Sequence, residues 1–440
     1  MSNAQLDPDS TPSTGKLQIN SVSSTGDGSS SVQPPRKRAR VDGHDYADSA
    51  AEGGLTASDV IRDERYYMAD GSCVLLVEKT LFNVHKSMLS RDSSSFATMF
   101  DLPQGEGPIE GTSDDHPILL AGDTVDEFRN FLWAMYALPL ELMVVHTAHA
   151  NLGKLMDIAR VSNKYSFKSL ETWALDAIQA YVNRQPSPAL LKPIALLNPH
   201  DPAHHTPTFR LSSGRISNLI RLAHLCNHEK LLGTMVDLLK RLMGCSVPYA
   251  YLAMCLADEL NLRELKGAAY LEVMQKTEVV AREHVEIPII ATPDARDGEH
   301  DEDVPETMLA PDGRLVVSFL QKHRLRCGYY GLSQAWEHMR LHPPQFDHAP
   351  SCGATWHQHG CTQSWMEFWK EKTRGEGVLA LGLADVLGRL RAIAKEFDKW
   401  GSATYMHHDC RLNAKRLIQE KLKQVEDDLP DYFSEERKMM

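Results

Sequence analysis

Residues 70–100 constrain the fold more than any other stretch, because their hydrophobic period changes partway along. Two short apolar runs, at residues 73–77 and 81–84, flank a turn signal at residues 78–80, which predicts two strands joined by a tight turn. Further on, the apolar side chains fall at helical spacing, which predicts one helix over about residues 87–100 with a buried face. The expected unit is a strand, a turn, a strand and a buried helix.

An earlier strand is expected at the short aromatic run of residues 65–68. The dipeptide Asp70-Gly71 follows it, and Asp-Gly between two strand-like runs is a strong hairpin signal. We therefore predict that this first strand pairs with residues 72–77.

The chain continues with further elements of a mixed fold. Residues 118–120 form a short apolar run that predicts another strand. Thr124 and Glu127 have the spacing of a capping box, so a helix is expected to begin there. Apolar residues at helical spacing predict two more helices, over residues 152–159 and 170–181.

Residues 62–182 resemble a BTB (POZ) domain, and in particular the divergent BTB proteins of fungi. The resemblance rests on an apolar strand, a turn with the pattern F-x-V-H-K into a helix, and a helix that ends in F-x-x-M-F. The residues that carry it are Phe82, His85, Lys86, Leu89, Phe96, Met99 and Phe100. It implies an α+β BTB/POZ-like domain that binds other proteins, as a homo- or hetero-oligomer, and a His85 side chain whose hydrogen bond caps the turn.

Three features that the family often carries are absent or altered. Some transcriptional members pair the cation at Lys86 with an Asp, but that position falls on Ser72 here. The apolar helix that precedes the first core strand in dimeric members has no counterpart beyond Val60 and Ile61. Cullin-3 adaptors carry an apolar-x-Glu motif, and residues 101–110 contain no clean match.

The chain has 440 residues and a formal net charge of −12, so two or three domains are expected, with no direct binding to nucleic acid. Eight scattered cysteines and the lack of a signal or membrane-spanning pattern predict reduced thiols in the nucleus or cytoplasm. The expected segments are a disordered tail (1–57), the BTB/POZ-like domain (62–182), a linker (183–211), a helical module (212–285), an acidic loop (286–312) and a mainly helical C-terminal region (313–440).

The polar tail contains a basic run made of Arg36, Lys37, Arg38 and Arg40 after two prolines. Such a run in an accessible segment predicts a nuclear localisation signal, and a solvated charge run is the alternative. The tail has too few apolar residues to offset the entropy of ordering, so no fold is expected for it.

The C-terminal region holds two unusual groups of residues. Trp336, Trp356, Trp365 and Trp369 lie close in sequence and predict a small core. Between them, Cys352, His357, His359 and Cys361 offer four ligands that zinc accepts, and a second group at residues 407–410 could contribute to a mixed site. A plain loop with free thiols is the alternative, and no other cofactor is expected.

No phosphate-binding loop, nucleophile elbow or zinc-protease motif occurs in the chain. We therefore predict a non-enzymatic interaction protein, with a nuclear, transcription-related scaffold as the leading hypothesis. A cullin-3 ubiquitin ligase substrate adaptor and a zinc-stabilised DNA-binding regulator are the alternatives.

Overall fold

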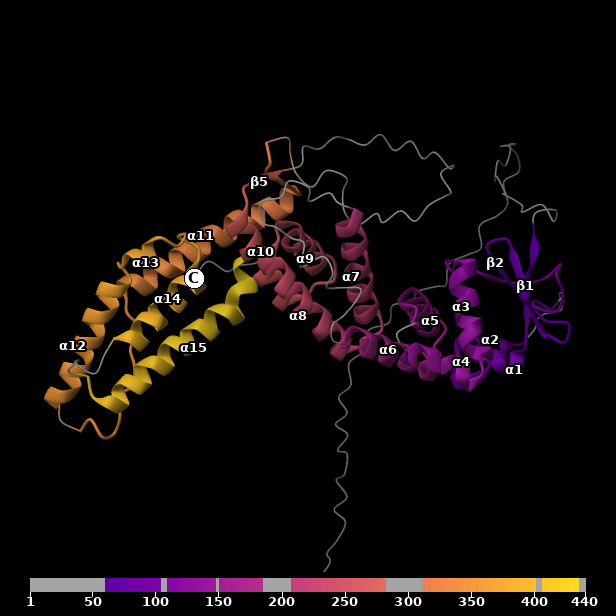
Figure 1. Ribbon diagram of the computed structural model, residues 1–440, viewed down its shortest axis with the longest axis horizontal. Helices are drawn as coiled ribbons and strands as arrows, with labels where there is room; N and C mark the ends of the chain where they lie inside the picture. The colour runs from indigo at the N-terminus through magenta and orange to yellow at the C-terminus, as the bar shows by residue number, and fades with distance from the viewer. Residues whose placement is uncertain are drawn as a thin grey trace, which may run out of the picture. The chain divides into compact units, whose positions relative to one another are not determined.

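The computed structural model describes residues 60–103, 109–147, 150–184, 207–281, 310, 312–353, 355–400 and 406–434, with side chains from residue 213 onward in the fourth range (Figure 1). The predicted tail with its basic run lies outside the described residues, as do most of the predicted linker and of the predicted acidic loop.

A four-stranded sheet forms the first part of the fold, in the order β1-β3-β2-β4. The strands β2 and β3 are antiparallel, whereas β1 pairs with β3 and β4 pairs with β2 in parallel. The bounds of the strands are β1 (Ile61–Tyr67), β2 (Cys73–Val77), β3 (Thr80–Val84) and β4 (Ile118–Leu120). The expected strands at residues 73–77, 81–84 and 118–120 are present.

The predicted hairpin between the first strand and β2 is wrong. A two-residue turn joins β2 directly to β3, with Glu78 at a φ of 51°, and β4 occupies the other side of β2. Because both edges of β2 are occupied, β1 pairs with β3 instead. Asp70 and Gly71 therefore lie in a crossing connection between strands that are not neighbours.

The predicted helix over residues 87–100 is two short helices. They are α1 (Lys86–Leu89) and α2 (Ser95–Phe100), separated by the 3₁₀ turn η1 (Arg91–Ser93). Asp92 and Ser93 have φ values of 62° and 52°, which a right-handed helix cannot accommodate. Ser94 then starts α2, since its hydroxyl oxygen accepts a hydrogen bond from the Ala97 amide.

Helices cover the sheet and complete its core. The predicted capping box is present, because the Thr124 hydroxyl accepts from the Glu127 amide at 3.3 Å and a Glu127 carboxylate oxygen accepts from the Thr124 amide at 3.1 Å. Phe82 of β3 meets Phe128 edge-on, with ring centroids 5.1 Å apart. The helices are α3 (Val125–Tyr136), α4 (Pro139–Met143), the 3₁₀ turn η2 (Val144–His146), α5 (Leu152–Lys164) and α6 (Lys168–Val182).

Four helices follow, each with an apolar stripe that is buried. They are α7 (Pro207–Leu225), α8 (Glu229–Cys245), α9 (Val247–Glu259) and α10 (Arg263–Lys276). The helix α7 begins inside the segment predicted as linker, so the helical module starts earlier than expected. Beyond it, β5 (Val279–Ala281) pairs in parallel with β6 (Leu315–Val317) across the predicted acidic loop.

The C-terminal region is helical, as expected. Three of its four clustered tryptophans are buried, whereas Trp356 is 74% exposed, so the predicted tryptophan core contains three members. No described helix is long and apolar enough to cross a membrane. The helices are α11 (Phe319–Leu341), α12 (Thr355–Lys372), α13 (Glu376–Leu379), α14 (Val386–Lys399) and α15 (His408–Tyr432).

Candidate functional site

Most of the residues that carry the BTB resemblance build the core. Phe82, Leu89 and Phe96 are buried, and the Phe96 ring stacks on Tyr165 with centroids 4.6 Å apart. Met99 and Phe100 are half-buried against the same core. These side chains hold α1 and α2 on the sheet, so they contribute to the fold.

His85 links the turn after β3 to the end of α3. Its Nδ1 lies 3.0 Å from the Tyr136 hydroxyl, and its amide donates to the same oxygen at 3.1 Å. Its Nε2 lies 3.3 Å from the Asp70 carboxylate. The described side chain makes no capping bond to α1, but its contacts with Tyr136 and Asp70 hold the turn between β3 and α1, so the expected structural role is present without a helix cap.

Ser72 contacts the main chain at the first residue of α1. The Ser72 hydroxyl oxygen accepts a hydrogen bond from the Lys86 amide at 2.9 Å. The Lys86 ammonium group lies 5.2 Å from the centre of the Phe100 ring, which is cation–π range. The Ser72 hydroxyl thus satisfies the first amide of α1.

The strand β1 is fastened by a buried carboxylate. Asp63 accepts hydrogen bonds from the Tyr66 amide at 2.8 Å and the Arg65 amide at 3.0 Å, and from the Arg129 guanidinium at 2.7 Å. Burial alone would raise the pKa of Asp63, but these donors outweigh it and hold the pKa below its usual value. The ion pair joins β1 to α3 and fixes the edge of the sheet.

The main exposed apolar surface of the described α+β domain is at α4. We call its four side chains, Leu138, Leu140, Met143 and Val144, the α4 patch. Leu140 is 82% exposed and Leu138 is 67% exposed. A contiguous exposed apolar segment is a feature of interaction sites in folded proteins. The sequence reasoning assigned no role to this segment; the available signal was its run of apolar residues after Pro139, which only Glu141 interrupts.

The α4 patch is held rigidly at both ends. The Leu138 amide donates to the Glu141 carboxylate at 2.8 Å, which closes the first turn of α4. The Arg184 guanidinium donates to the carbonyl oxygens of Val145, at 3.2 Å, and of Thr147. A surface that is already ordered loses little conformational entropy when a partner binds.

Lys154 lies near Glu141 of α4 and places its ammonium group over an aromatic ring. Its Nζ lies 3.2 Å from the centre of the Trp133 ring. Burial, and then the nearby positive charge of Arg65, lower the pKa of Lys154 to about 8, while Glu141 acts in the opposite direction.

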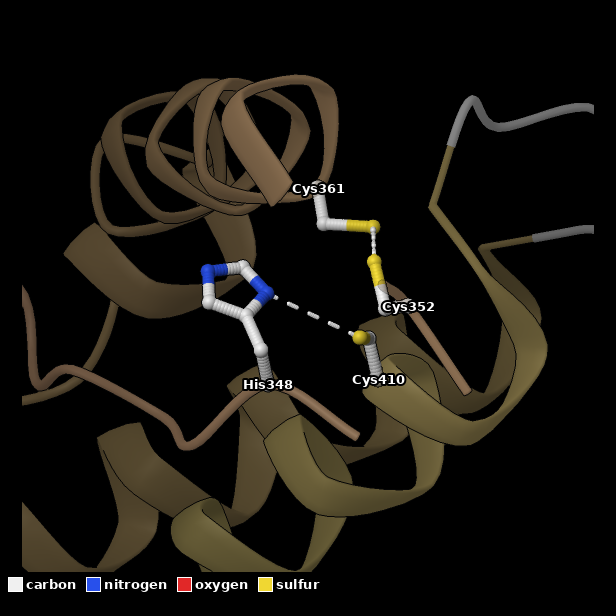
Figure 2. A group of neighbouring side chains, drawn as sticks. All are labelled: His348, Cys352, Cys361 and Cys410. Carbon is white, nitrogen blue, oxygen red and sulfur yellow. Dashed lines mark hydrogen bonds between the residues drawn. The ribbon is translucent and has the colours of Figure 1, made fainter. Parts of the chain in front are cut away.

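The structure brings together half of the ligands predicted in the C-terminal region. Cys352 and Cys361 have sulfur atoms 3.9 Å apart, and His348 and Cys410 complete a compact group with them (Figure 2). Burial, and then the neighbouring thiols, raise the pKa of Cys352 to about 12, so this thiol is no activated nucleophile.

His357 and His359, the other two predicted ligands, are exposed and lie outside this group. The segment is helical, and a separation of two residues places His359 on the opposite side of α12 from Cys361. His357 is in the first turn of the helix and packs against Trp356, with ring centroids 3.6 Å apart. Cys410 comes from the second predicted group, whereas His348 was missed because nothing in its local pattern marks it.

A family model of the BTB/POZ domain matches residues 69–180. This part of the chain is therefore a BTB/POZ domain, which is a module for protein–protein interaction and oligomerisation. The match contains the strands β2 to β4 and nearly all of α6, and it leaves β1 outside. No curated protein and no solved structure matches the chain.

Proposed function

We propose that this chain is a non-enzymatic interaction protein whose BTB/POZ domain binds a protein partner through the α4 patch. The observation that carries the proposal is the exposure of four apolar side chains within residues 138–144, on a segment that hydrogen bonds hold in place. Burial of Leu140 and Leu138 would remove apolar area from water at about 25 cal/mol per Å². The patch thus supplies affinity at little ordering cost.

The test replaces one leucine of the patch by a charge. Leu140→Glu is compared with Leu119→Glu, which changes an exposed leucine of β4 in the same domain. Tagged full-length chains are isolated from cells under the same conditions, and the proteins bound to each are quantified. We expect Leu140→Glu to reduce at least one partner by about tenfold or more, since a central apolar contact is worth over 1 kcal/mol.

Sedimentation analysis of the same two variants distinguishes self-association from binding to another protein. If Leu140→Glu and the unmodified chain retain the same partners and the same oligomeric state, the α4 patch is not the binding surface. Equal melting temperatures for the two variants would show that the fold is unaffected.

A cullin-3 adaptor is the second candidate. Exposed apolar residues within residues 101–110, the position where such adaptors carry their apolar-x-Glu motif, favour it. Leu102 and Ile109 are 58% and 46% exposed and flank the part of that segment outside the described residues. Purified chain is mixed with cullin-3, with an established adaptor as the positive control. Binding that Leu102→Asp abolishes would support this function, and no binding beside a working control would exclude it.

We also propose that the basic run directs the chain to the nucleus, where a transcription-related scaffold would act. Its four cations follow Pro34 and Pro35, which favour an extended and accessible segment. Replacing Arg36, Lys37, Arg38 and Arg40 by alanine in a tagged chain tests this. We expect loss of nuclear accumulation, and an unchanged distribution would contradict the proposal.

A further inference from the structure

Four side chains of the C-terminal region direct ligand atoms toward one point. The atoms are the Sγ of Cys352, Cys361 and Cys410 and the Nδ1 of His348, and all lie within 4.8 Å of one another (Figure 2). The Cys352 and Cys361 sulfurs are 3.9 Å apart, and the Cys410 sulfur is 3.7 Å from the His348 Nδ1. The three cysteines are at most 1% exposed.

Two of these separations match tetrahedral coordination of a single ion, and all four ligand atoms lie within 4.8 Å of one another. A zinc ion with Zn–S bonds of about 2.3 Å and Zn–N bonds of about 2.0–2.1 Å holds two sulfurs about 3.8 Å apart and a sulfur and a nitrogen about 3.6 Å apart. The separation of the Cys352 and Cys361 sulfurs and that of the Cys410 sulfur and the His348 Nδ1 each differ from these ideal values by about 0.1 Å.

The imidazole of His348 is oriented by a second hydrogen bond. Its Nε2 lies 3.1 Å from the Thr362 hydroxyl oxygen. That hydroxyl donates its proton to the Gln358 carbonyl oxygen at 3.0 Å, so it accepts from Nε2–H. The Nδ1 is then the unprotonated nitrogen, which is the form that binds a metal.

Two backbone amides are directed at the sulfurs. The Ala349 amide donates to the Cys410 sulfur at 3.4 Å, and the His407 amide donates to the Cys361 sulfur at 3.2 Å. Hydrogen bonds of this kind stabilise thiolates, and three thiolates on a divalent ion leave a net charge of −1. The two amides would thus stabilise the thiolates of Cys410 and Cys361 on a bound ion.

We propose that Cys352, Cys361, Cys410 and His348 bind one structural zinc ion. Three thiolates and an imidazole are ligands that zinc prefers, and four protein ligands close its coordination sphere to substrate. A cluster of two irons divides its ligands between two metals and spreads them further apart than these atoms lie. On binding, the three thiols release their protons to solvent and form three Zn–S bonds, with no change of oxidation state.

The site joins three segments of the C-terminal region. His348 and Cys352 come from the connection between α11 and α12, Cys361 from α12, and Cys410 from the first turn of α15. Since the unfolded chain has no preformed site, the binding energy of the metal becomes folding energy for this region. This role is independent of partner binding by the BTB/POZ domain.

The test is metal analysis of the purified full-length chain after gel filtration under reducing conditions. We expect about one zinc ion per chain, falling at least fivefold in Cys410→Ser and in His348→Ala. The matched controls retain their zinc. They are Cys245→Ser, which alters an exposed thiol, and the double variant His357→Ala, His359→Ala, which removes the exposed histidines of the same segment.

A second measurement applies if a ligand variant fails to fold. Zinc in the unmodified chain is exchanged for cobalt(II), and the visible spectrum is recorded. Intense absorption of tetrahedral cobalt with a thiolate charge-transfer band supports the site. A chain that takes up neither zinc nor cobalt, or that has a Cys352–Cys361 disulfide when isolated under reducing conditions, overturns it.

Discussion

The BTB/POZ domain and the helical region after residue 310 both bury aromatic side chains, but they assemble their cores differently. In the BTB/POZ domain a tight turn joins β2 to β3, and α3 brings Phe128 against Phe82, which lies 46 residues earlier in the chain. In the C-terminal region the core is built by helices without a sheet: Trp369 donates to the Met339 carbonyl oxygen at 2.9 Å and Trp365 to that of Pro344 at 2.7 Å, across 30 and 21 residues. Both cores therefore depend on long-range contacts, and only the strand–turn–strand unit of the first is set by a local pattern.

The largest expected effect tests how much the C-terminal core depends on such long-range contacts. Trp369→Ala removes a fully buried indole and its hydrogen bond, and we expect a loss of about 3–5 kcal/mol in the free energy of unfolding. The control on the same helix is Trp356→Ala, which changes an exposed indole and should cost about 0.5 kcal/mol or less.

Denaturant unfolding combined with hydrogen exchange of separate peptides measures both variants. Exchange in Trp369→Ala should rise in α11 and α12 more than in β2, because the lost contact joins those two helices. Equal stability of the two tryptophan variants would show that the C-terminal core does not depend on Trp369.

The second largest expected effect concerns the partners that stabilise a buried charged side chain in each region. Asp63→Asn breaks the ion pair with Arg129 and should cost about 1–3 kcal/mol. Because the folded state lowers the pKa of Asp63, the stabilisation is complete above the unfolded value of about 3.9 and is lost as the pH falls through the folded value. In the C-terminal region the buried Arg389 instead donates to the Leu381 carbonyl oxygen at 2.6 Å, which does not titrate.

Stability against denaturant from pH 7 down to about pH 3 measures this contrast. The unmodified chain should lose more stability than Asp63→Asn over the acid range, because the variant has no carboxylate left to protonate at that position. Parallel acid profiles for the two proteins would contradict the assignment.

The smallest effect compares two capping boxes of the same design. Thr124 begins α3 in the BTB/POZ domain and Ser318 begins α11 in the C-terminal region; each hydroxyl accepts from an amide three residues on, at 3.3 and 3.1 Å. Replacing either by alanine should cost about 0.5–2 kcal/mol. Thr124→Ser retains the oxygen and serves as the control. A cost confined to one helix would show that caps contribute differently in the two regions.

The accuracy of the sequence-based predictions depends on how far apart in the chain the interacting residues lie. The strands at residues 73–77 and 118–120 and the capping box of α3 are as predicted, because each depends on side chains only a few positions apart. The hairpin with the first strand was wrong because β3 and β4 compete for the edges of β2. The broken helix at Asp92 was missed because its backbone conformation leaves no signature in hydrophobic spacing.

For the proposed metal site, the sequence alone placed two thiols, Cys352 and Cys361, within ten residues of each other. It also offered residues 407–410 as a second group, but only the tertiary structure selected Cys410 from that group, brought in His348 and turned His359 outward. Periodicity, capping and turns are short-range interactions, so the order of residues determined the helices, most strands and the BTB/POZ pattern. The partner of β1 and the four ligand atoms depend on which distant segments meet, and the packing of the whole chain decides that.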